Sequence, residues 1–364
     1  MKILFYFGHP AQYLFLRETI KKLKKNGSQI KILIKTKDVL EDLLLQDKLE
    51  YVNILPNERG ITKAAIAFSL LKRNMILLPI VLKFRPSLMV GTDATIAQLG
   101  WLLRINRITI TEDDYEVIKT LGDLSYPFTK TILCPEVCDV GKWKYKKIGY
   151  AGYMKLGYLH PNIFKRDPEI PKKYHLQNKY AVIRLAKLTA HHDFGVKGID
   201  ESFLDEIIST FEKKSIAIFI SAEGNISEKY HKYLFNINPT DMHQILANAE
   251  FLICDSQSMS VEASMLGVPS IRFSSFSGRI SVLEELEHNY QLTFGVNPNN
   301  SELLLTKLKE LLSIQNLKEI FHNRRSKMLS DKIDVTAFLV WFIENYPKSK
   351  IIMNKNPDYQ NNFK

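Results

Sequence analysis

Residues 251–269 of this 364-residue chain read FLICDSQSMSVEASMLGVP, a pattern typical of an α/β fold. The run Phe251–Asp255 predicts a buried strand, and the polar residues after it lead into a helix predicted over Ser258–Leu266. Gly267 ends that helix, and Ser270–Phe273 is predicted as the next strand. A strand, a helix and another strand in such short succession indicate parallel strands joined by a crossover helix.

The same alternation extends through the rest of the chain and divides it into two halves. The pattern weakens between Val140 and Lys179, where Pro161, Pro168 and Pro171 lie. We therefore predict an α/β protein with two doubly wound, Rossmann-type domains that face a central cleft. The predicted divisions are a first domain (1–150), a linker region (151–178), a second domain (179–332), a helix able to cross back to the first domain (333–347) and a flexible tail (348–364).

The composition is that of an ordinary soluble protein. Apolar residues make up 45% and charged residues 24%, which argues against a disordered, collagen-like or coiled-coil chain. Cys134, Cys138 and Cys254 are too few for a disulfide framework, so we expect buried thiols in a reducing cytoplasm. We recognise no signal peptide, and no apolar stretch reaches the roughly 18 residues that a membrane-spanning helix needs.

The turn after the strand at 251–255 is the strongest candidate site, because ligands of open parallel sheets bind beyond the carboxyl ends of strands. The turn Ser256-Gln257-Ser258-Met259 offers two hydroxyls and backbone N–H groups at a helix N-terminus, where the helix dipole favours a phosphate or diphosphate. Glu262 lies one helical turn beyond Ser258, and its carboxylate suits a vicinal diol such as a ribose. Alternatively, Ser256 or Ser258 only caps the helix, and Glu262 is a solvated surface residue.

Further donor-binding candidates follow from the second half. Arg184 interrupts the apolar strand predicted over Tyr180–Leu185, so its guanidinium, together with Lys187, could neutralise a diphosphate. A solvated charge is the alternative. Glu223 follows the strand predicted over Ile216–Ser221, and we expect it to line the cleft.

Candidates for catalysis follow strands of the first half. His9 could act as a base or hold a substrate hydroxyl or phosphate, or it could be an ordinary turn residue beside Pro10. Asp93 could take part in the reaction or cap the helix predicted to begin at Ala94.

Glu112 begins the acidic run Glu112-Asp113-Asp114. Mutual repulsion of the three carboxylates can raise the pKa of one of them into the range of a general base. A capping box formed by Thr111 and Asp114 is an alternative interpretation. A metal-binding acidic cluster is another, but it would leave the second α/β half without a role.

Residues 255–269 resemble the donor-binding motif of two-domain GT-B sugar-nucleotide enzymes, above all the non-hydrolysing UDP-N-acetylglucosamine 2-epimerases. That motif reads Asp-Ser-Gly-Gly-x-x-Glu-Glu-Ala-x-x-Leu-Gly-x-Pro, and here Gln257 and Ser258 replace its two glycines. The resemblance implies that Ser256 lies near the diphosphate and Glu262 on the ribose. The matching residues are Asp255, Ser256, Glu262, Ala263, Leu266, Gly267 and Pro269.

Other segments have counterparts in the same enzymes. Asp93 lies in a segment similar to the epimerase Gly-Asp-Thr motif, and Glu112 takes the place of an acidic residue in the epimerase His-x-Glu-Ala-Gly motif. His191–Gly195 resembles a catalytic loop of the epimerases but lacks its arginine pair. Pro239–His243 corresponds to the loop that commonly holds the nucleobase in GT-B proteins.

The whole chain resembles the domain-of-unknown-function 354 family, whose GT-B-like members often occur in surface-polysaccharide loci. The resemblance covers roughly residues 2–300 and implies a GT-B fold. The segments that carry it are Gly8–Ala11, Val39–Leu44, Cys134-Pro135, Gly149–Tyr153 with Leu159, and the Glu262 motif.

Positive charge is concentrated near the N-terminus. The net charge is +11, and residues 1–36 hold eight basic residues against the single acidic Glu18. This excess favours anionic partners, but the absence of zinc-finger and RNP motifs argues against nucleic acid. The basic surface is either a solvated face or a site of weak attraction to anionic lipid, about 1 kcal/mol per basic residue, assisted by the amphipathic region Ile61–Val90. The latter would add peripheral association with the inner face of the cell membrane.

Together these features predict a metal-independent GT-B glycosyltransferase. It would move a sugar from a nucleotide-sugar donor, expected to be a UDP-sugar, to a glycan or lipid-linked acceptor in surface-polysaccharide biosynthesis, without a cofactor. A UDP-sugar 2-epimerase with the same donor site is one alternative. A non-catalytic protein that binds sugar nucleotides is another, because a fold does not determine a function.

Overall fold

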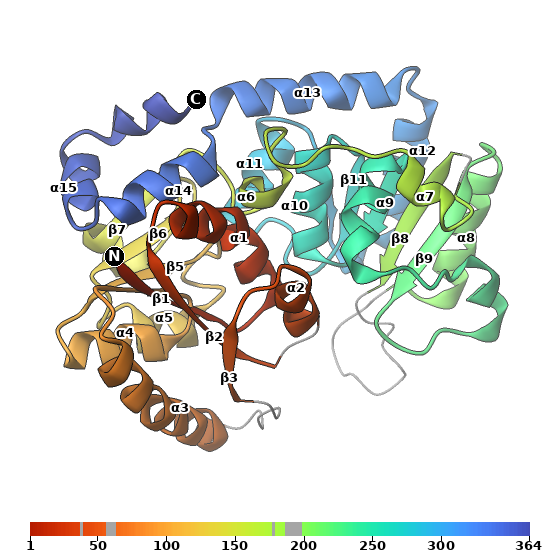
Figure 1. Ribbon diagram of the computed structural model, residues 1–364. Helices are drawn as coiled ribbons and strands as arrows, with labels where there is room; N and C mark the ends of the chain where they lie inside the picture. Colours follow the sequence, from red (N-terminus) through yellow and green to blue (C-terminus); the bar gives the residue numbers. More distant parts are fainter. Residues whose placement is uncertain (37–38, 56–62, 177–178, 186–198) are drawn as a thin grey trace. The chain divides into compact units, whose positions relative to one another are not determined.

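The computed structural model in Figure 1 describes residues 1–36, 39–55, 63–176, 179–185 and 199–364. The chain forms two compact units. The first unit combines Met1–Tyr158 with Lys332–Lys364, and the second unit is the continuous segment Leu159–Asp331. The segment predicted as a linker thus begins inside the first unit.

The first unit is built on a seven-stranded parallel sheet in the order β3-β2-β1-β4-β5-β6-β7. The order reverses between β1 and β4, which is the arrangement of a doubly wound sheet. Its strands are β1 (Lys2–Phe7), β2 (Gln29–Lys35), β3 (Tyr51–Leu55), β4 (Leu88–Gly91), β5 (Asn106–Ile110), β6 (Thr131–Pro135) and β7 (Lys147–Tyr150).

Helices cover this sheet, and local sequence explains where the first begins and ends. Helix α1 starts with Pro10, whose fixed φ suits the first helical turn, and it ends among Lys22, Lys24 and Lys25, which complement the helix dipole. The helices in the N-terminal part of this unit are α1 (Pro10–Lys25), α2 (Leu40–Gln46), α3 (Lys63–Phe84), α4 (Ala94–Leu102) and α5 (Lys119–Ser125).

The C-terminal helix α14 (Val335–Glu344) returns to the first unit and packs against α1, which confirms the predicted crossover. A short helix, α6 (Leu156–Leu159), contacts both of them. There the Gly157 carbonyl accepts a hydrogen bond from the Thr336 hydroxyl at 3.2 Å. A Cβ at Gly157 would lie 2.5 Å from the carbonyl oxygen of Phe15 in α1. Glycine is therefore the residue that lets these helices approach.

The tail 348–364 is ordered, contrary to the prediction of a flexible segment. It forms α15 (Lys348–Lys355) and a 3₁₀ helix (Pro357–Phe363). The ring of Tyr359 stacks on Trp341 of α14 with centroids 4.6 Å apart, and Phe363 packs edge-on against Phe338. Gln360 also accepts a hydrogen bond from the Ala151 N–H and donates one to Glu136. Aromatic packing and these polar contacts together hold an Asn- and Lys-rich segment on the first unit.

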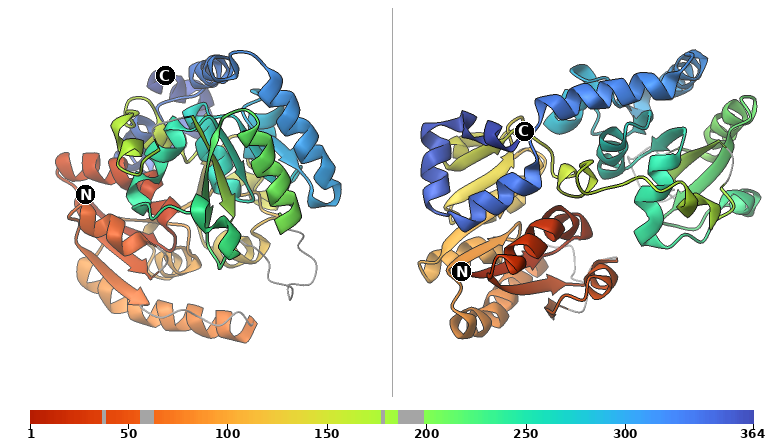
Figure 2. Two further views of the ribbon diagram at one scale, coloured as in Figure 1. Left: turned by 90° about the vertical axis from the view of Figure 1, so that its right-hand side faces the viewer. Right: turned by 45° about the horizontal axis from the view of Figure 1, so that its top comes forward.

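The second unit contains a five-stranded parallel sheet in the order β12-β11-β10-β8-β9, and its order changes direction between β10 and β8. Figure 2 shows helices on both of its faces. Its strands are β8 (Tyr180–Leu185), β9 (Ala217–Ala222), β10 (Phe251–Cys254), β11 (Ser270–Phe273) and β12 (Phe294–Val296).

Its main core lies under α8 and α12, whose leucines and isoleucines pack with alternate strand residues such as Ile183 and Ile253. The opposite sheet face carries α10. The helices are α7 (Glu169–Lys172), α8 (Glu201–Glu212), α9 (Met242–Asn248), α10 (Gln257–Leu266), α11 (Ser281–His288), α12 (Ser301–Ser313) and α13 (Leu317–Asp331).

The predicted fold class is confirmed: both sheets are parallel and doubly wound, as in GT-B proteins. Cys134, Cys138 and Cys254 are buried free thiols, as expected. Over the ranges that the structure describes, no helix is both long enough and apolar enough to cross a membrane.

The Gly157 contact predicts a stability effect. Gly157→Ala would force α6 away from the Phe15 carbonyl, and such overpacking costs about 1–3 kcal/mol. We expect a lower midpoint in urea denaturation. The matched control is Gly224→Ala, because a Cβ there meets no atom within 4 Å; equal midpoints for the two variants would contradict the packing argument.

Candidate functional site

His9 and Asp93 follow adjacent strands at the carboxyl edge of the first sheet. Strand β1 pairs with β4 from Ile3 to Tyr6, so the residues that follow the two strands lie at the point where strand order reverses. His9 is exposed and is the N-cap of α1, where its Nδ1 accepts the Ala11 N–H at 3.2 Å. The imidazole therefore lies at a helix amino end that is open to solvent.

Asp93 is the N-cap of α4, and both of its carboxylate oxygens are engaged. Oδ1 accepts the backbone N–H of Thr95 at 3.0 Å and its hydroxyl at 2.8 Å. Oδ2 accepts from the Arg73 guanidinium of α3 at 2.5 Å, and the Arg73 side chain is buried. These contacts favour the capping interpretation of Asp93 over a catalytic one.

Glu112 follows β5, the next strand of the same edge, and is also held by partners. Its carboxylate accepts the Met154 N–H at 2.5 Å and pairs with Lys155 at 3.0 Å. The exposed fractions of the Glu112 and Lys155 side chains are 12% and 7%, so the ion pair is largely buried. This arrangement suits a structural anchor better than a base that must reach a substrate.

The capping box suggested for this segment does not form, because α5 begins only at Lys119. The Thr111 hydroxyl instead accepts the Asp113 N–H at 3.3 Å, and Asp114 accepts the Asp139 N–H at 2.6 Å. The carboxylates of Glu112 and Asp114 thus have different partners. Within the described ranges, no group of three or more His, Cys, Asp or Glu side chains is placed to hold a metal ion.

Asp113 belongs to the acidic run in which one raised pKa was expected, although the sequence interpretation selected Glu112 as the site residue. The nearby protein partly removes water from its carboxyl, and this desolvation is the main cause that raises the pKa of Asp113. The charges of Glu112 and Asp114 raise this pKa further, and the charge of Lys155 lowers it. Asp113 is nevertheless exposed to solvent. An exposed carboxyl with a raised pKa is better placed than Glu112 to accept a proton from a substrate.

The carboxyl edge of the second sheet carries a row of polar residues on one face. In the strand register, Arg184 of β8 pairs with Cys254 of β10, which pairs with Arg272 of β11. Register partners in a parallel sheet point to the same face. The two arginines therefore flank the strand that leads into α10, on the face opposite the main core.

Arg184 is held close to Glu223, as the adjacent positions of β8 and β9 require. Its NH1 donates to the Ser221 hydroxyl at 2.6 Å, and its NH2 forms an ion pair with Glu223. Arg184 is mostly buried, whereas the Glu223 side chain is 55% exposed. The guanidinium thus lies in place beside the strand ends, with part of its charge balanced by Glu223.

The turn after β10 forms the amino end of the ten-residue helix α10. Ser256 is its N-cap, and the hydroxyl accepts the Met259 N–H at 3.3 Å. Gln257 donates to the Ser274 hydroxyl of the loop after β11, Ser258 is half-buried, and the Met259 side chain is buried. The capping contact of the alternative interpretation is therefore present at Ser256. Because α10 directly follows β10, its amino end lies at the carboxyl edge of the sheet.

Glu262 is not the solvated surface residue of the alternative interpretation. Only 13% of its side chain is exposed, and its Oε1 lies 3.3 Å from Nε2 of His243 on α9. His243 belongs to the Pro239–His243 segment that has a counterpart in the nucleobase loop of GT-B proteins. The structure therefore joins the two segments that the resemblance had treated separately.

Arg272 is a second residue that the sequence interpretation missed. It is fully buried, and its guanidinium has no hydrogen-bond partner among the described residues. The nearest carboxylates are those of Glu284 and Glu287 on α11, each 3.8 Å away, and burial lowers the pKa of Arg272 and raises that of Glu287. The sequence could have indicated Arg272, because an arginine interrupts the predicted apolar strand Ser270–Phe273. The same argument led to the selection of Arg184.

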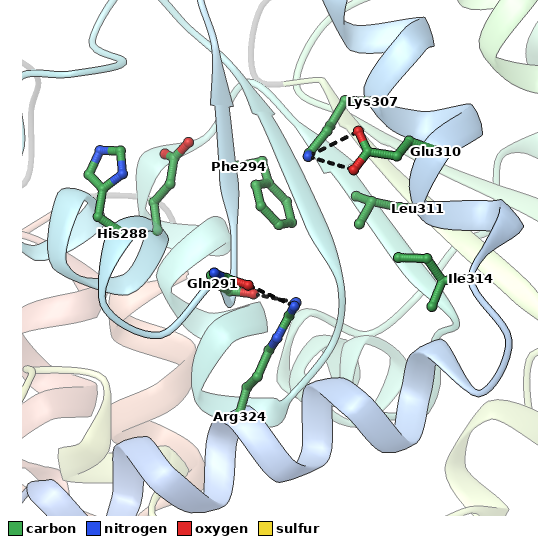
Figure 3. Close-up of a pocket in the computed structure, with 9 residues that line it drawn as sticks. His288, Gln291, Phe294, Lys307, Glu310, Leu311, Ile314 and Arg324 are labelled. Carbon is green, nitrogen blue, oxygen red and sulfur yellow. Dashed lines mark hydrogen bonds and ion pairs between the residues drawn. The ribbon is translucent and has the colours of Figure 1, made fainter.

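A cavity of about 340 Å³ lies elsewhere in the second unit, beside the start of β12 (Figure 3). Phe294 lies between Lys307, which pairs with Glu310 at 3.1 Å, and Arg324, which donates to Gln291. None of the predicted site residues lines it. The predicted Lys187 and His191–Gly195 lie outside the described residues.

Comparison with protein families supports the interpretation of the sequence. The model of the family described as "Protein of unknown function (DUF354)" matches residues 6–284, which is most of the chain. No curated protein matches the sequence significantly.

Solved structures with a similar fold include two kinds of sugar-nucleotide enzyme. A Staphylococcus aureus MnaA–UDP structure has a TM-score of 0.67 at 14% identity, with 98% of this chain and 97% of that chain covered. The UDP-GlcNAc 2-epimerase of Methanocaldococcus jannaschii has a TM-score of 0.64 at 15% identity, covering 91% and 99%. MurG of Acinetobacter baumannii has a TM-score of 0.59 at 12% identity, covering 94% and 99%. At these identities the likeness establishes the fold.

The raised pKa of Asp113 predicts how stability depends on pH. The folded protein holds this proton more tightly than the unfolded chain, so the contribution of Asp113 to stability is full below the ordinary aspartate pKa of about 3.9 and is lost as pH rises through the raised value. Asp113→Asn should therefore be more stable than the wild type at neutral pH, and the difference should shrink on acidification. Urea midpoints at several pH values would measure it.

The matched variant is Glu112→Gln, which removes the charged partner of the buried Lys155. Breaking a buried pair costs about 3–5 kcal/mol, so its effect on the neutral-pH midpoint should have the opposite sign. Equal effects of the two substitutions would contradict the different environments assigned to them.

Proposed function

This chain belongs to the family described as "Protein of unknown function (DUF354)", and from that premise we propose that it is a glycosyltransferase that uses a nucleotide-sugar donor, a UDP-sugar in the favoured form. The acceptor would be a glycan or a lipid-linked sugar of surface-polysaccharide biosynthesis. The similar structures include MurG and a glycotransferase of kitacinnamycin, with TM-scores of 0.59. The family membership and the fold support this class of substrate without specifying the sugar.

The observation that carries the proposal is the amino end of α10 at the reversal of strand order in the second sheet. A donor diphosphate would bind there, against the helix dipole and beside Arg184. Glu262 lies one turn further along α10 and would accept hydrogen bonds from the ribose hydroxyls. Among the similar structures, MnaA was solved with UDP and a Neisseria meningitidis epimerase with UDP-GlcNAc, which supports a uridine nucleotide.

The first unit would supply the acceptor side of the reaction. A base there takes the proton of the acceptor hydroxyl, the hydroxyl oxygen forms a bond to the sugar carbon, and the bond from that carbon to the diphosphate breaks. Asp113 is the favoured base, with His9 as a second candidate. Helix α10 and Arg184 would stabilise the charge on the departing diphosphate, so the step needs no metal or cofactor.

A UDP-sugar 2-epimerase is the second candidate, because several similar structures are epimerases. Such an enzyme needs acidic groups that move a proton at a carbon of the sugar ring and needs no acceptor. Of the predicted acids, Asp93 and Glu112 are both engaged in structural contacts. This favours transfer over epimerisation.

The donor site predicts a ligand-dependent change in thermal stability. UDP at about 100 times its dissociation constant should stabilise the protein by about 2.7 kcal/mol, and Glu262→Ala should remove most of the shift. Glu206→Ala on the exposed side of α8 is the matched control and should retain it. A full UDP shift in the Glu262 variant would exclude Glu262 from the site.

Activity can be tested with radiolabelled UDP-N-acetylglucosamine and isolated membranes as the source of acceptor. We expect label in the lipid or glycan fraction, and a loss of about 100-fold or more in Asp113→Asn, because general-base catalysis contributes that much. Asp42→Asn, an exposed acid of α2, should keep the activity. Formation of the 2-epimer without membranes would favour the second candidate, and UDP binding without any turnover would favour a non-catalytic role.

A further inference from the structure

Helix α3 is anchored to the first unit by one face. Leu70, Leu77 and Val81 are buried on that face. Two polar contacts fix it to α4: the Arg73–Asp93 ion pair and a hydrogen bond from Asn74 to the Gln98 side chain at 2.8 Å. Helices α3 and α4 pack side by side (Figure 1). These contacts therefore determine which residues of α3 face outwards.

The outward face of α3 is apolar. Phe68, Leu71, Met75 and Leu82 recur at helical spacing, and the exposed fractions of these side chains range from 53% for Leu82 to 71% for Phe68. At the end of α4, Trp101 is also exposed. A helix that is apolar on both its inward and outward faces, at the surface of a unit, indicates a surface that another phase or molecule covers.

The exposed charged residues that belong to this stretch of sequence are basic. Lys72, Lys83 and Arg85 are exposed along and just after α3. Between Glu58 and Glu112 the sequence contains a single acidic residue, Asp93, whose charge is paired with the buried Arg73. The charged residues beside the apolar stripe are therefore basic.

We propose that this face docks on an anionic lipid surface. The α3 face consists of Phe68, Leu71, Lys72, Met75, Leu82 and Lys83. Its apolar side chains would enter the boundary between lipid headgroups and acyl chains, and its lysines would lie beside anionic headgroups, as in helices that rest in the plane of a membrane. A second copy of the chain fits less well, because it would bring the same cations against each other.

Charge density alone would place the lipid contact on the lysine-rich N-terminal segment and not on the α3 face. The lysine-rich N-terminal segment includes the exposed Lys24 and Lys25 of α1, but the apolar stripe of α1, such as Ile20 and Leu23, is buried in the core. Helix α1 thus has charge without any large exposed apolar side chain. The proposal is independent of the proposed function, because lipid binding by the first unit needs neither donor nor acceptor.

The experiment is sedimentation of the full chain with vesicles of phosphatidylcholine, either pure or containing about 30% phosphatidylglycerol. Two variants test the face: Leu71→Gln with Met75→Gln, and Lys72→Gln with Lys83→Gln. Two matched controls change the same chemistry elsewhere in the first unit. They are Lys24→Gln with Lys25→Gln on α1, and Leu45→Gln at a leucine that is 62% exposed on α2.

We expect the wild type to bind the anionic vesicles and each α3 double variant to lose at least about tenfold in the partition coefficient. The controls should change it much less. Thermal midpoints should be unchanged, because the altered side chains are exposed, and the UDP-dependent shift should persist in every variant. If the α3 variants keep the UDP-dependent thermal shift while they lose vesicle binding, the test of the lipid-binding face is independent of the test of the donor site.

Three results would overturn the proposal. The first is a wild type that does not bind anionic vesicles, and the second is an equal loss in the Lys24/Lys25 control, which would reduce the effect to net charge. The third is a dimer in analytical ultracentrifugation that Leu71→Gln with Met75→Gln dissociates without any lipid binding, which would make the α3 face a contact between copies.

Discussion

The reversal of strand order in each parallel sheet is the constraint on which the candidate site depends. Parallel strands need crossover connections, and where successive crossovers run to opposite sides, the segments after two adjacent strands diverge and leave the strand ends accessible. In the first unit this happens between β1 and β4, and in the second between β8 and β10. His9, Arg184 and Ser256 all lie at these two points, so their position at the strand ends, where ligands of open parallel sheets bind, is a result of topology rather than of their individual chemistry.

The positions of several candidate residues could be predicted from the sequence, because they directly follow predicted strands. Helix caps occupy the same positions. His9, Asp93 and Ser256 each follow a strand, and each caps the next helix. Sequence cannot separate the two roles, since both require a short polar residue at that place. The ion pairs favour a structural role for two of the predicted acids: Arg73 pairs with Asp93 and Lys155 pairs with Glu112, each from a segment distant in the chain. Asp113, in contrast, is exposed.

Most of the fold was predictable because its strands follow local sequence patterns. Buried parallel strands are short continuous apolar runs, and their periodicity is local. Longer-range packing was not predictable in the same way. The tail was expected to be flexible from its Asn and Lys content, but Tyr359 and Phe363 pack on α14. Arg272 likewise interrupts an apolar strand, and only the structure shows Glu284 and Glu287 of α11 near it.

The return of the C-terminal helices has a consequence for the order of folding during synthesis. Strand β1 and α14 belong to one unit but come from opposite ends of the chain, whereas the second unit is a single continuous segment. Domains generally fold as they leave the ribosome. The second unit can therefore be complete before α14 has been translated, and until then the face of α1 that receives α14 is uncovered in the nascent protein. During that interval the first unit lacks the apolar side chains that α14 contributes to its core, among them Phe338 and Leu339.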